Sequence, residues 1–407
     1  MAALKYWVWL SALPGLSESS KQLLLTHFTS PEDVYYADPD ALLQVEGLGR
    51  EQAALLEHKS LAPAERILAD CARSGIFILT MADALYPERL RNIYQPPVLL
   101  YGKGAMPLFD EEAAVAIVGT RQCTPYGVRC AEKLGYELTQ QGGMVVSGMA
   151  RGVDSAAMRG ALRLGGFTCA VLGGGVDVIY PAENRRLYED IAATGVLLSE
   201  YPPGTRPDGW HFPMRNRILS GLSVATVVVE APARSGALIT AANALEQGRE
   251  VFAVPGPIDA PNSVGCHRLL REGAGLATCG WDILGEFENR FPHKLHAAVP
   301  PLPPLPADAG APCVAAETQS EPAPEAAQSP AMPRMTAAEW DSLTQDQQTL
   351  LHALRTDIPQ LTDQLAEQTG LPIQRVLPAI TLLEISGWAV QNGARSFVRT
   401  VLLPEEE

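Results

Sequence analysis

The sequence predicts an α/β fold in which a doubly wound parallel sheet forms the core. Between residues 115 and 272, continuous apolar runs rich in β-branched residues alternate with amphipathic helical patterns. Strands of this composition are buried on both faces, which is typical of parallel sheets covered by helices. Glycine-rich turns follow several runs, and in such sheets ligands bind beyond the carboxyl ends of the strands. The same pattern therefore predicts both a fold and the place of a site.

The elements of this core can be placed in chain order. The expected strands are 115–118, 144–147, 168–172, 196–199, 225–230 and 251–254. The expected helices are 125–141, 153–164, 182–193, 214–220, 237–246 and 263–272. These elements define a core domain over residues 111–290.

A helical domain is expected before the core, over residues 1–70. Turns at 13–17 and 45–50, each with glycine between apolar residues, precede short helical patterns. Such turns occur in helix-hairpin-helix modules, whose backbone N–H groups can contact a DNA phosphate. Acidic surroundings favour the alternative, a tight turn in a small helical bundle. The domain as a whole is expected to be SAM-like or helix-hairpin-helix-like. Residues 71–110 are expected to bridge this domain to the core, with one strand at 76–80.

A tether and a winged helix are expected after the core. Residues 291–335 are rich in proline and alanine, which is typical of an extended linker. Residues 336–407 then show helices at 346–356, 361–369 and 372–386 and a hairpin at 388–401 around Asn392-Gly393, the element order of a winged helix. The third helix carries only one cation, Arg375. This favours docking of a partner or a regulatory role over DNA binding.

Composition narrows the functional class. The 407 residues include seven scattered cysteines without a CxxC pair, which predicts neither a disulfide framework nor a zinc site and favours the cytoplasm. No apolar run approaches the roughly 20 residues that span a bilayer, and no secretory signal is evident, so no membrane association is expected. Neither a metal nor another cofactor is indicated.

The distribution of charge separates the core from the rest. The net charge is −15, yet residues 112–256 carry 13 basic and 13 acidic residues. Twelve of those basic residues are arginines. Because arginine forms bidentate contacts with phosphate, the core is suited to specific phosphate binding rather than to diffuse attraction.

Several turns of the core are predicted to hold phosphates. Backbone N–H groups at helix starts bind anions, and several such places along one sheet edge indicate a nucleic-acid strand rather than one nucleotide. The candidate DNA-binding residues are Gly119, Thr120, Arg121, Ser147, Gly148, Arg151, Gly152, Gly173, Phe212, Arg215, Asn216, Arg217, Ser235, Gly236 and Thr240.

Some of these residues have alternatives. Arg121, after Gly119-Thr120 at a strand end, is the first choice as a phosphate clamp, although it could be a surface arginine or part of an ion pair. Arg215 and Arg217 lie on different faces of a helix, so one of them is expected to pair internally. Phe212 could stack on a base or anchor the core.

No catalytic residue is predicted. Glu230 ends a strand, but no partner acid, metal cluster or nucleophile–base pair stands out near it in the sequence. A structural carboxylate that bonds the arginines is the preferred interpretation.

Taken together, these segments resemble the DNA-processing protein A family (DprA, also called Smf). The matching stretches are 116–121, 126–127, 147–154, 180–184, 199–204, 212–223, 235–241 and 254–256. The resemblance implies a Rossmann-like core that binds single-stranded DNA, dimerises and helps to load the RecA recombinase, without catalytic turnover. Cys266-His267 depart from the asparagine that many relatives have after the preceding glycine.

The hypothesis from the sequence is a non-enzymatic protein that binds single-stranded DNA, protects incoming DNA and helps to load RecA in natural transformation or homologous recombination. The expected partners are single-stranded DNA, RecA and a second copy of the chain. The alternatives are a nucleotide-processing enzyme of related fold, such as a phosphoribohydrolase, and a plain adaptor.

Overall fold

The computed structural model describes residues 3–297, 335–336, 339–340, 343–356, 360–391 and 396–401. The chain divides into two compact units, residues 1–305 and 306–407. Most of residues 291–335, the predicted tether, lie outside the described ranges.

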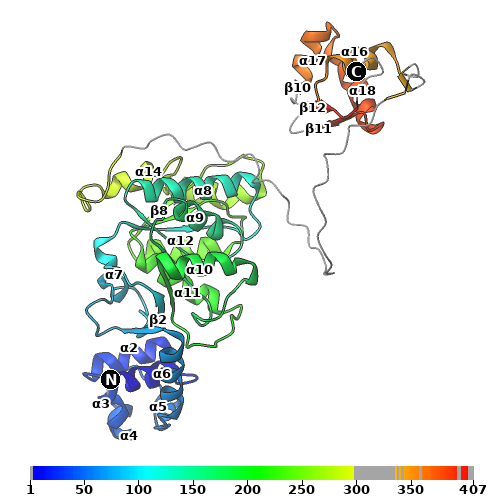
Figure 1. Ribbon diagram of the computed structural model, residues 1–407. Coiled ribbons are helices and arrows are strands. Elements are labelled where there is room, and N and C mark those ends of the chain that lie inside the picture. The colour runs from blue at the N-terminus through cyan, green and yellow to red at the C-terminus, as the bar shows by residue number, and fades with distance from the viewer. Residues whose placement is uncertain are drawn as a thin grey trace. The chain divides into compact units, whose positions relative to one another are not determined.

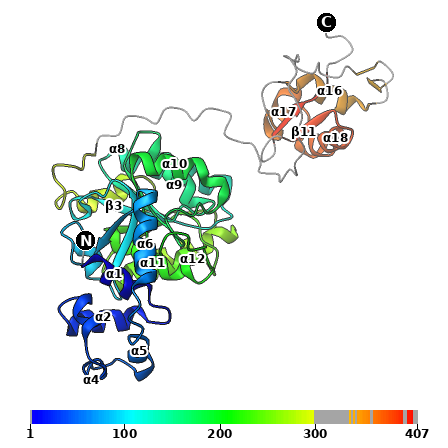
Figure 2. The ribbon, with the colours of Figure 1, turned by 60° about the horizontal axis from the view of Figure 1, so that its bottom comes forward.

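The first unit begins with six short helices, which cluster at one end of it (Figure 1 and Figure 2). They are α1 (Leu4–Ala12), α2 (Glu18–His27), α3 (Pro31–Tyr36), α4 (Pro39–Leu43), α5 (Arg50–Leu55) and α6 (Ala62–Ser74). Trp9, Leu24 and Leu56 are buried in their shared core. The two predicted glycine turns precede α2 and α5, and Gly15 and Gly47 take the positive φ that such turns require.

A nine-stranded sheet forms the centre of this unit. Its strands are β1 (Phe77–Thr80), β2 (Leu99–Gly104), β3 (Ala114–Val118), β4 (Met144–Ser147), β5 (Thr168–Val171), β6 (Val196–Ser199), β7 (Ala225–Val228), β8 (Glu250–Ala253) and β9 (Gly275–Leu276). Their spatial order is β1-β2-β6-β5-β4-β3-β7-β8-β9. All neighbours from β6 to β9 are parallel, as the continuous apolar runs predict.

The segment expected to be a bridge contributes two strands to the sheet. In addition to the predicted strand, β1, it supplies β2, which pairs antiparallel with both β1 and β6. The sequence interpretation missed β2, because the prolines before it indicate a break rather than a strand.

Helices cover both faces of the sheet, which is the doubly wound arrangement. One face packs against α8 (Pro125–Gln140), α9 (Val153–Leu162), α10 (Arg185–Thr194) and α14 (Trp281–Leu284). The other packs against α7 (Glu88–Arg91), α11 (His211–Leu222), α12 (Gly236–Glu246) and α13 (Val264–Arg271). From the central strand β3, the chain continues to β4 on one side, whereas β7 lies on the other. Loops therefore diverge at the carboxyl end of β3, which is where such sheets bind ligands.

The second unit has the elements of a winged helix. It contains α16 (Gln345–Ala353), α17 (Thr362–Thr369) and α18 (Ile373–Ile385), with strands β10 (Gln360–Leu361), β11 (Ala389–Gln391) and β12 (Ser396–Arg399) in the order β10-β12-β11. A capping box at Thr344 begins α16, and Gly370 ends α17 with a positive φ. The predicted turn residues Asn392-Gly393 lie outside the described ranges.

Candidate nucleic-acid interface

A cleft of about 670 Å³ lies beyond the carboxyl ends of β3 and β7. Its walls are the loop after β3, the first turns of α11 and the loop between β7 and α12. A smaller cavity of about 50 Å³ adjoins it, between the loops after β4 and β5 and the ring of Phe212. Both share Arg121, Tyr180 and Phe212, so they form one continuous depression.

Most of the predicted residues lie at this depression. The larger cleft is lined by Gly119, Thr120, Arg121, Phe212, Arg215, Asn216, Ser235, Gly236 and Thr240. The smaller cavity is lined by Gly148, Arg151 and Gly173. Turns that are distant in the sequence thus meet at one edge of the sheet.

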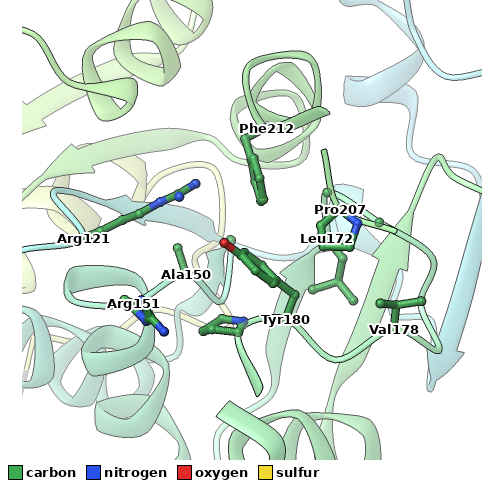
Figure 3. A pocket seen from close by; sticks show the side chains of 12 residues that line it. Arg121, Ala150, Arg151, Leu172, Val178, Tyr180, Pro207 and Phe212 are labelled. Carbon is green, nitrogen blue, oxygen red and sulfur yellow. The ribbon is translucent and has the colours of Figure 1, made fainter. Parts of the chain in front are cut away.

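Arg121 extends from the loop after β3 across the mouth of the cleft. Its guanidinium carbon lies 4.7 Å from the centroid of the Phe212 ring, and the Tyr180 ring lies 5.7 Å from the same ring (Figure 3). Arg121 is exposed and makes no salt bridge within the described ranges, although the buried Asp154 lies within range of its charge. A cation over an aromatic face remains able to bind a phosphate through its outward N–H groups.

Arg215 forms the floor of the cleft. It is 4% exposed, and its Nη1 donates to the carbonyl oxygens of Gly148, at 3.1 Å, and of Val171. Burial lowers the pKa of Arg215 to about 10, so the guanidinium stays charged at neutral pH. Its Nε is buried without a hydrogen-bond partner. Arg215 therefore places a fixed positive charge beneath the cleft.

Asp154 holds the loop between β4 and α9. Its Oδ2 accepts hydrogen bonds from the backbone N–H groups of Gly148, at 3.2 Å, and Ala150, at 3.4 Å. Burial raises the pKa of Asp154, and the charge of Arg215 opposes that rise. The loop also contains Met149, a buried non-glycine residue with φ of 52°. The buried Asp154 thus acts as an anchor of the loop.

Two glycines of this loop, Gly148 and Gly152, serve protein packing. A Cβ at Gly148 would lie 2.4 Å from Nη1 of Arg215, and one at Gly152 would lie 2.5 Å from the carbonyl oxygen of Thr120. Gly152 also has φ of 77°. The sequence interpretation gave these glycines to the approach of a ligand, whereas here protein atoms occupy that space. At Gly236, by contrast, nothing lies within 4 Å of the added Cβ, so this lining position is open.

Three predicted residues do not line the depression. Ser147 is fully buried and donates from its hydroxyl to the carbonyl oxygen of Ile117 at 2.6 Å. Gly152 packs against Thr120, as described above. Arg217 points to the opposite side of α11 and pairs with Glu200 at 2.7 and 2.9 Å. The expectation that one arginine of the pair on α11 is used internally is confirmed, and that arginine is Arg217.

Glu230 was predicted to bond the arginines, but the structure gives it a different partner. The carboxylate is buried, but it bonds no arginine among the residues that the structure describes. It accepts from the backbone N–H of Thr124 at 2.8 Å and from the Thr124 hydroxyl at 2.6 Å. Because Thr124 is the N-cap of α8, Glu230 fixes the start of that helix. Glu230 therefore has a structural role, as expected, but it stabilises the fold by hydrogen bonds to Thr124 and not to arginines.

The sequence interpretation missed two lining residues with evident chemistry. Tyr180 is 45% exposed and stands opposite Phe212, and Arg234 is an exposed cation in the loop before α12. A tyrosine before Pro181 and an arginine between alanine and serine carry no local signal. Both become candidates only when the fold places them beside the predicted turns.

The described part of the chain shows neither a metal site nor a membrane-spanning helix. No three side chains of histidine, cysteine, aspartate or glutamate gather there as a metal site would require. Among the same residues, no helix has both the length and the apolar character that a membrane crossing requires.

The sequence matches two protein-family models. The family model described as DNA recombination-mediator protein A matches residues 77–288, and the one described as DprA winged helix domain matches residues 318–394. DNA processing protein DprA of Bacillus subtilis is 43% identical over 225 residues, which are 55% of this chain and 76% of that protein.

Two solved structures also match the chain. The X-ray structure of DNA processing protein A from Streptococcus pneumoniae superposes with a TM-score of 0.62 and 37% identity, over 70% of this chain and 98% of that one. A structure of the Helicobacter pylori protein, described for its single-stranded DNA binding mode, aligns over 54% of this chain and 97% of its own at 30% identity and a TM-score of 0.47. From the extent of the family match and of the Bacillus relative, the chain belongs to the DNA recombination-mediator protein A family.

Proposed function

We propose that the cleft beyond β3 and β7 binds the backbone of single-stranded DNA. The observation that carries this proposal is the state of Arg121, which lies across the cleft mouth over Phe212 without a carboxylate partner within the described ranges. Arg234 on the facing loop is likewise exposed and unpaired with any described acid. Charges that the fold does not neutralise are available to phosphates.

Aromatic side chains beside these arginines favour a single strand. Phe212 and Tyr180 offer ring faces to unpaired bases, and stacking of this kind tolerates any base. In a duplex the bases are stacked on each other and cannot reach these rings. We therefore expect little sequence preference and weaker binding of duplex.

The spread of arginines along the cleft favours a strand over a small nucleotide. The cleft volume of about 670 Å³ continues into the smaller cavity, with arginines at separate points along it. The buried acids beside it, Asp154 and Glu230, are occupied in holding loops and a helix start. They are not placed as an acid–base pair for hydrolysis of a glycosidic bond, which the alternative phosphoribohydrolase function requires.

As a member of a recombination-mediator family, the chain is proposed to protect incoming single strands and to transfer them to RecA in transformation or homologous recombination. A homodimer would hold two clefts on one strand and raise the effective affinity. The acidic flanks, net −5 for residues 1–111 and −8 for residues 291–407, would reduce nonspecific attraction to duplex.

The test is fluorescence anisotropy of a labelled poly-dT oligonucleotide with the full chain at two salt concentrations. Wild type should bind tightly, with log affinity falling by about 0.7 per contacted phosphate per unit of log salt. Arg121→Ala should weaken binding on the order of 10- to 100-fold, because a charge-assisted contact and the cation over Phe212 are both lost.

Arg129→Ala is a matched control, since this arginine lies on α8 and does not line the cleft. Salt-insensitive binding, or equal affinity of the Arg121 and Arg129 variants and wild type, would contradict the proposal. Release of base from nucleoside monophosphates would instead support the enzymatic alternative. RecA transfer is tested separately, by the rate of RecA filament formation on the bound strand.

A further inference from the structure

We propose that Trp210 is a second stacking platform for single-stranded DNA, outside the cleft, which holds a base of the strand as it leaves Phe212. This inference rests on the proposed function of the cleft. It adds a binding residue and lengthens the stretch of DNA that one chain contacts.

Trp210 is exposed at the rim of the cleft. Its side chain is 63% exposed, although tryptophan is among the largest apolar residues. In the chain it stands at the N-cap of α11, between Gly209 and Phe212, which both line the cleft. Because successive residues at a helix start point in different directions, Phe212 faces the cleft while Trp210 faces solvent beside it.

The exposed ring is held in place by other aromatic residues. The Trp210 ring centroid lies 4.1 Å from that of His211, edge to face, and His211 stacks on Tyr201 with centroids 3.9 Å apart. His211 is itself buried, and its Nδ1 lies 3.0 Å from the carbonyl oxygen of Gly173, a residue of the smaller cavity. The tryptophan is therefore supported by His211, which in turn contacts Gly173, a lining residue of the smaller cavity.

A supported ring with an open face suits a nucleobase. The ring loses little conformational freedom when a base stacks on it, so most of the stacking energy contributes to affinity. Continuity with the cleft through Gly209 and Phe212 favours a DNA strand over a protein as the occupant.

The experiment measures the affinity of a series of oligo-dT lengths, from 3 to about 15 nucleotides, for wild type, Trp210→Ala and Trp210→Phe. Trp210→Ala should bind the longer oligonucleotides roughly 5- to 150-fold more weakly, and Trp210→Phe should remain within about fivefold of wild type. The shortest oligonucleotides, which the cleft alone accommodates, should bind all three proteins equally. Tyr94→Ala is the control, because Tyr94 is 78% exposed and does not line the cleft.

Intrinsic fluorescence gives an independent readout. The chain has six tryptophans, so the quenching on DNA binding that is present in wild type and missing in Trp210→Phe reports on Trp210. Weaker binding by Trp210→Ala together with lost quenching in Trp210→Phe would support the platform. Equal affinity of Trp210→Ala and wild type at every length, or equal quenching in wild type and Trp210→Phe, would overturn it.

Arg121→Ala separates this inference from the function of the cleft. If Arg121→Ala loses binding while Trp210→Ala does not, the cleft stands and the platform is rejected. If neither variant is affected, or wild type binds no oligonucleotide, both proposals fail. Loss of RecA capture by Trp210→Ala with unchanged DNA affinity would make the exposed ring a protein contact, which also overturns the platform.

Discussion

The two faces of helix α11 use arginine in opposite ways. On one face, Arg215 lies beneath the cleft, and its charge is held by backbone carbonyl oxygens rather than by a salt bridge. On the other face, two residues later, Arg217 is paired with Glu200, and both side chains are nearly buried, at 9% and 11% exposure. One helix therefore presents to the site an arginine without a salt bridge, near the buried Asp154, and to the interior an arginine in a direct ion pair.

This difference shows that the number of arginines does not measure the charge available to a ligand. Arg375, the cation of the third winged-helix helix, makes the same point: its Nε and Nη2 bind Asp346 at 2.9 and 2.6 Å. Arg121 and Arg234 have no such partner among the described residues.

Arg217→Ala should destabilise the first unit by about 3–5 kcal/mol, because it leaves Glu200 buried and unpaired. Urea unfolding followed by circular dichroism would measure the loss. The double variant Arg217→Met, Glu200→Leu should recover most of it, since both charges are then removed. A loss below about 1 kcal/mol for Arg217→Ala would show that solvent reaches the pair, contrary to its burial.

Arg215→Lys should weaken binding of single-stranded DNA about tenfold or more while the charge is retained. A lysine cannot reproduce the planar fork that meets the carbonyls of Gly148 and Val171, so the loop after β4 loses its support. Anisotropy gives the affinity, and hydrogen exchange of residues 148–152 should rise in parallel. Unchanged affinity would mean that charge alone, without loop geometry, decides binding.

Arg234→Ala and Arg375→Ala form a matched pair of single charge removals. Arg234→Ala should reduce the slope of log affinity against log salt by about 0.7 and weaken binding several-fold. Arg375→Ala should leave the affinity and the salt slope within twofold of the wild-type values, because Asp346 already neutralises that cation. The reverse result would move the DNA contact from the cleft to the winged helix.

Arg151→Ala should have the smallest effect, with no measurable shift of the urea midpoint. Its pair with Glu183 is as short as that of Arg217, at 2.6 Å, but both side chains are more than half exposed, at 61% and 54%. Solvent screens such pairs, so the same distance carries far less stability. A shift comparable to that of Arg217→Ala would refute burial as the cause of the difference.

Much of the fold was predictable from local patterns. The six central strands and the helices between them carry their own apolar periodicity, so the sequence places them to within a few residues. The strand β2 was not predictable, because prolines precede it and its partners, β1 and β6, are set by the tertiary fold. Helix α11 begins at His211, three residues before the predicted start.

The position of the site was predictable from the sequence, but the role of each residue in it was not. Glycine turns at strand ends correctly placed Arg121 and Phe212 at one depression. They could not reveal that Ser147 and Gly152 serve packing, because a small residue fits both a tight protein contact and a ligand contact. Nor could the spacing of Arg215 and Arg217 decide which one faces Glu200, since that depends on how α11 lies on the sheet.

The antiparallel pairing of β2 with β6 also orders the events of synthesis. Tyr101 pairs with Ser199, and Leu99, Leu100 and Tyr101 are completely buried in the finished sheet. A ribosome releases this apolar strand long before its partner exists. Until β6 has been synthesised, β2 can pair only with β1 among its neighbours in the sheet. A chain truncated before residue 196 would therefore leave the apolar edge of β2 unpaired.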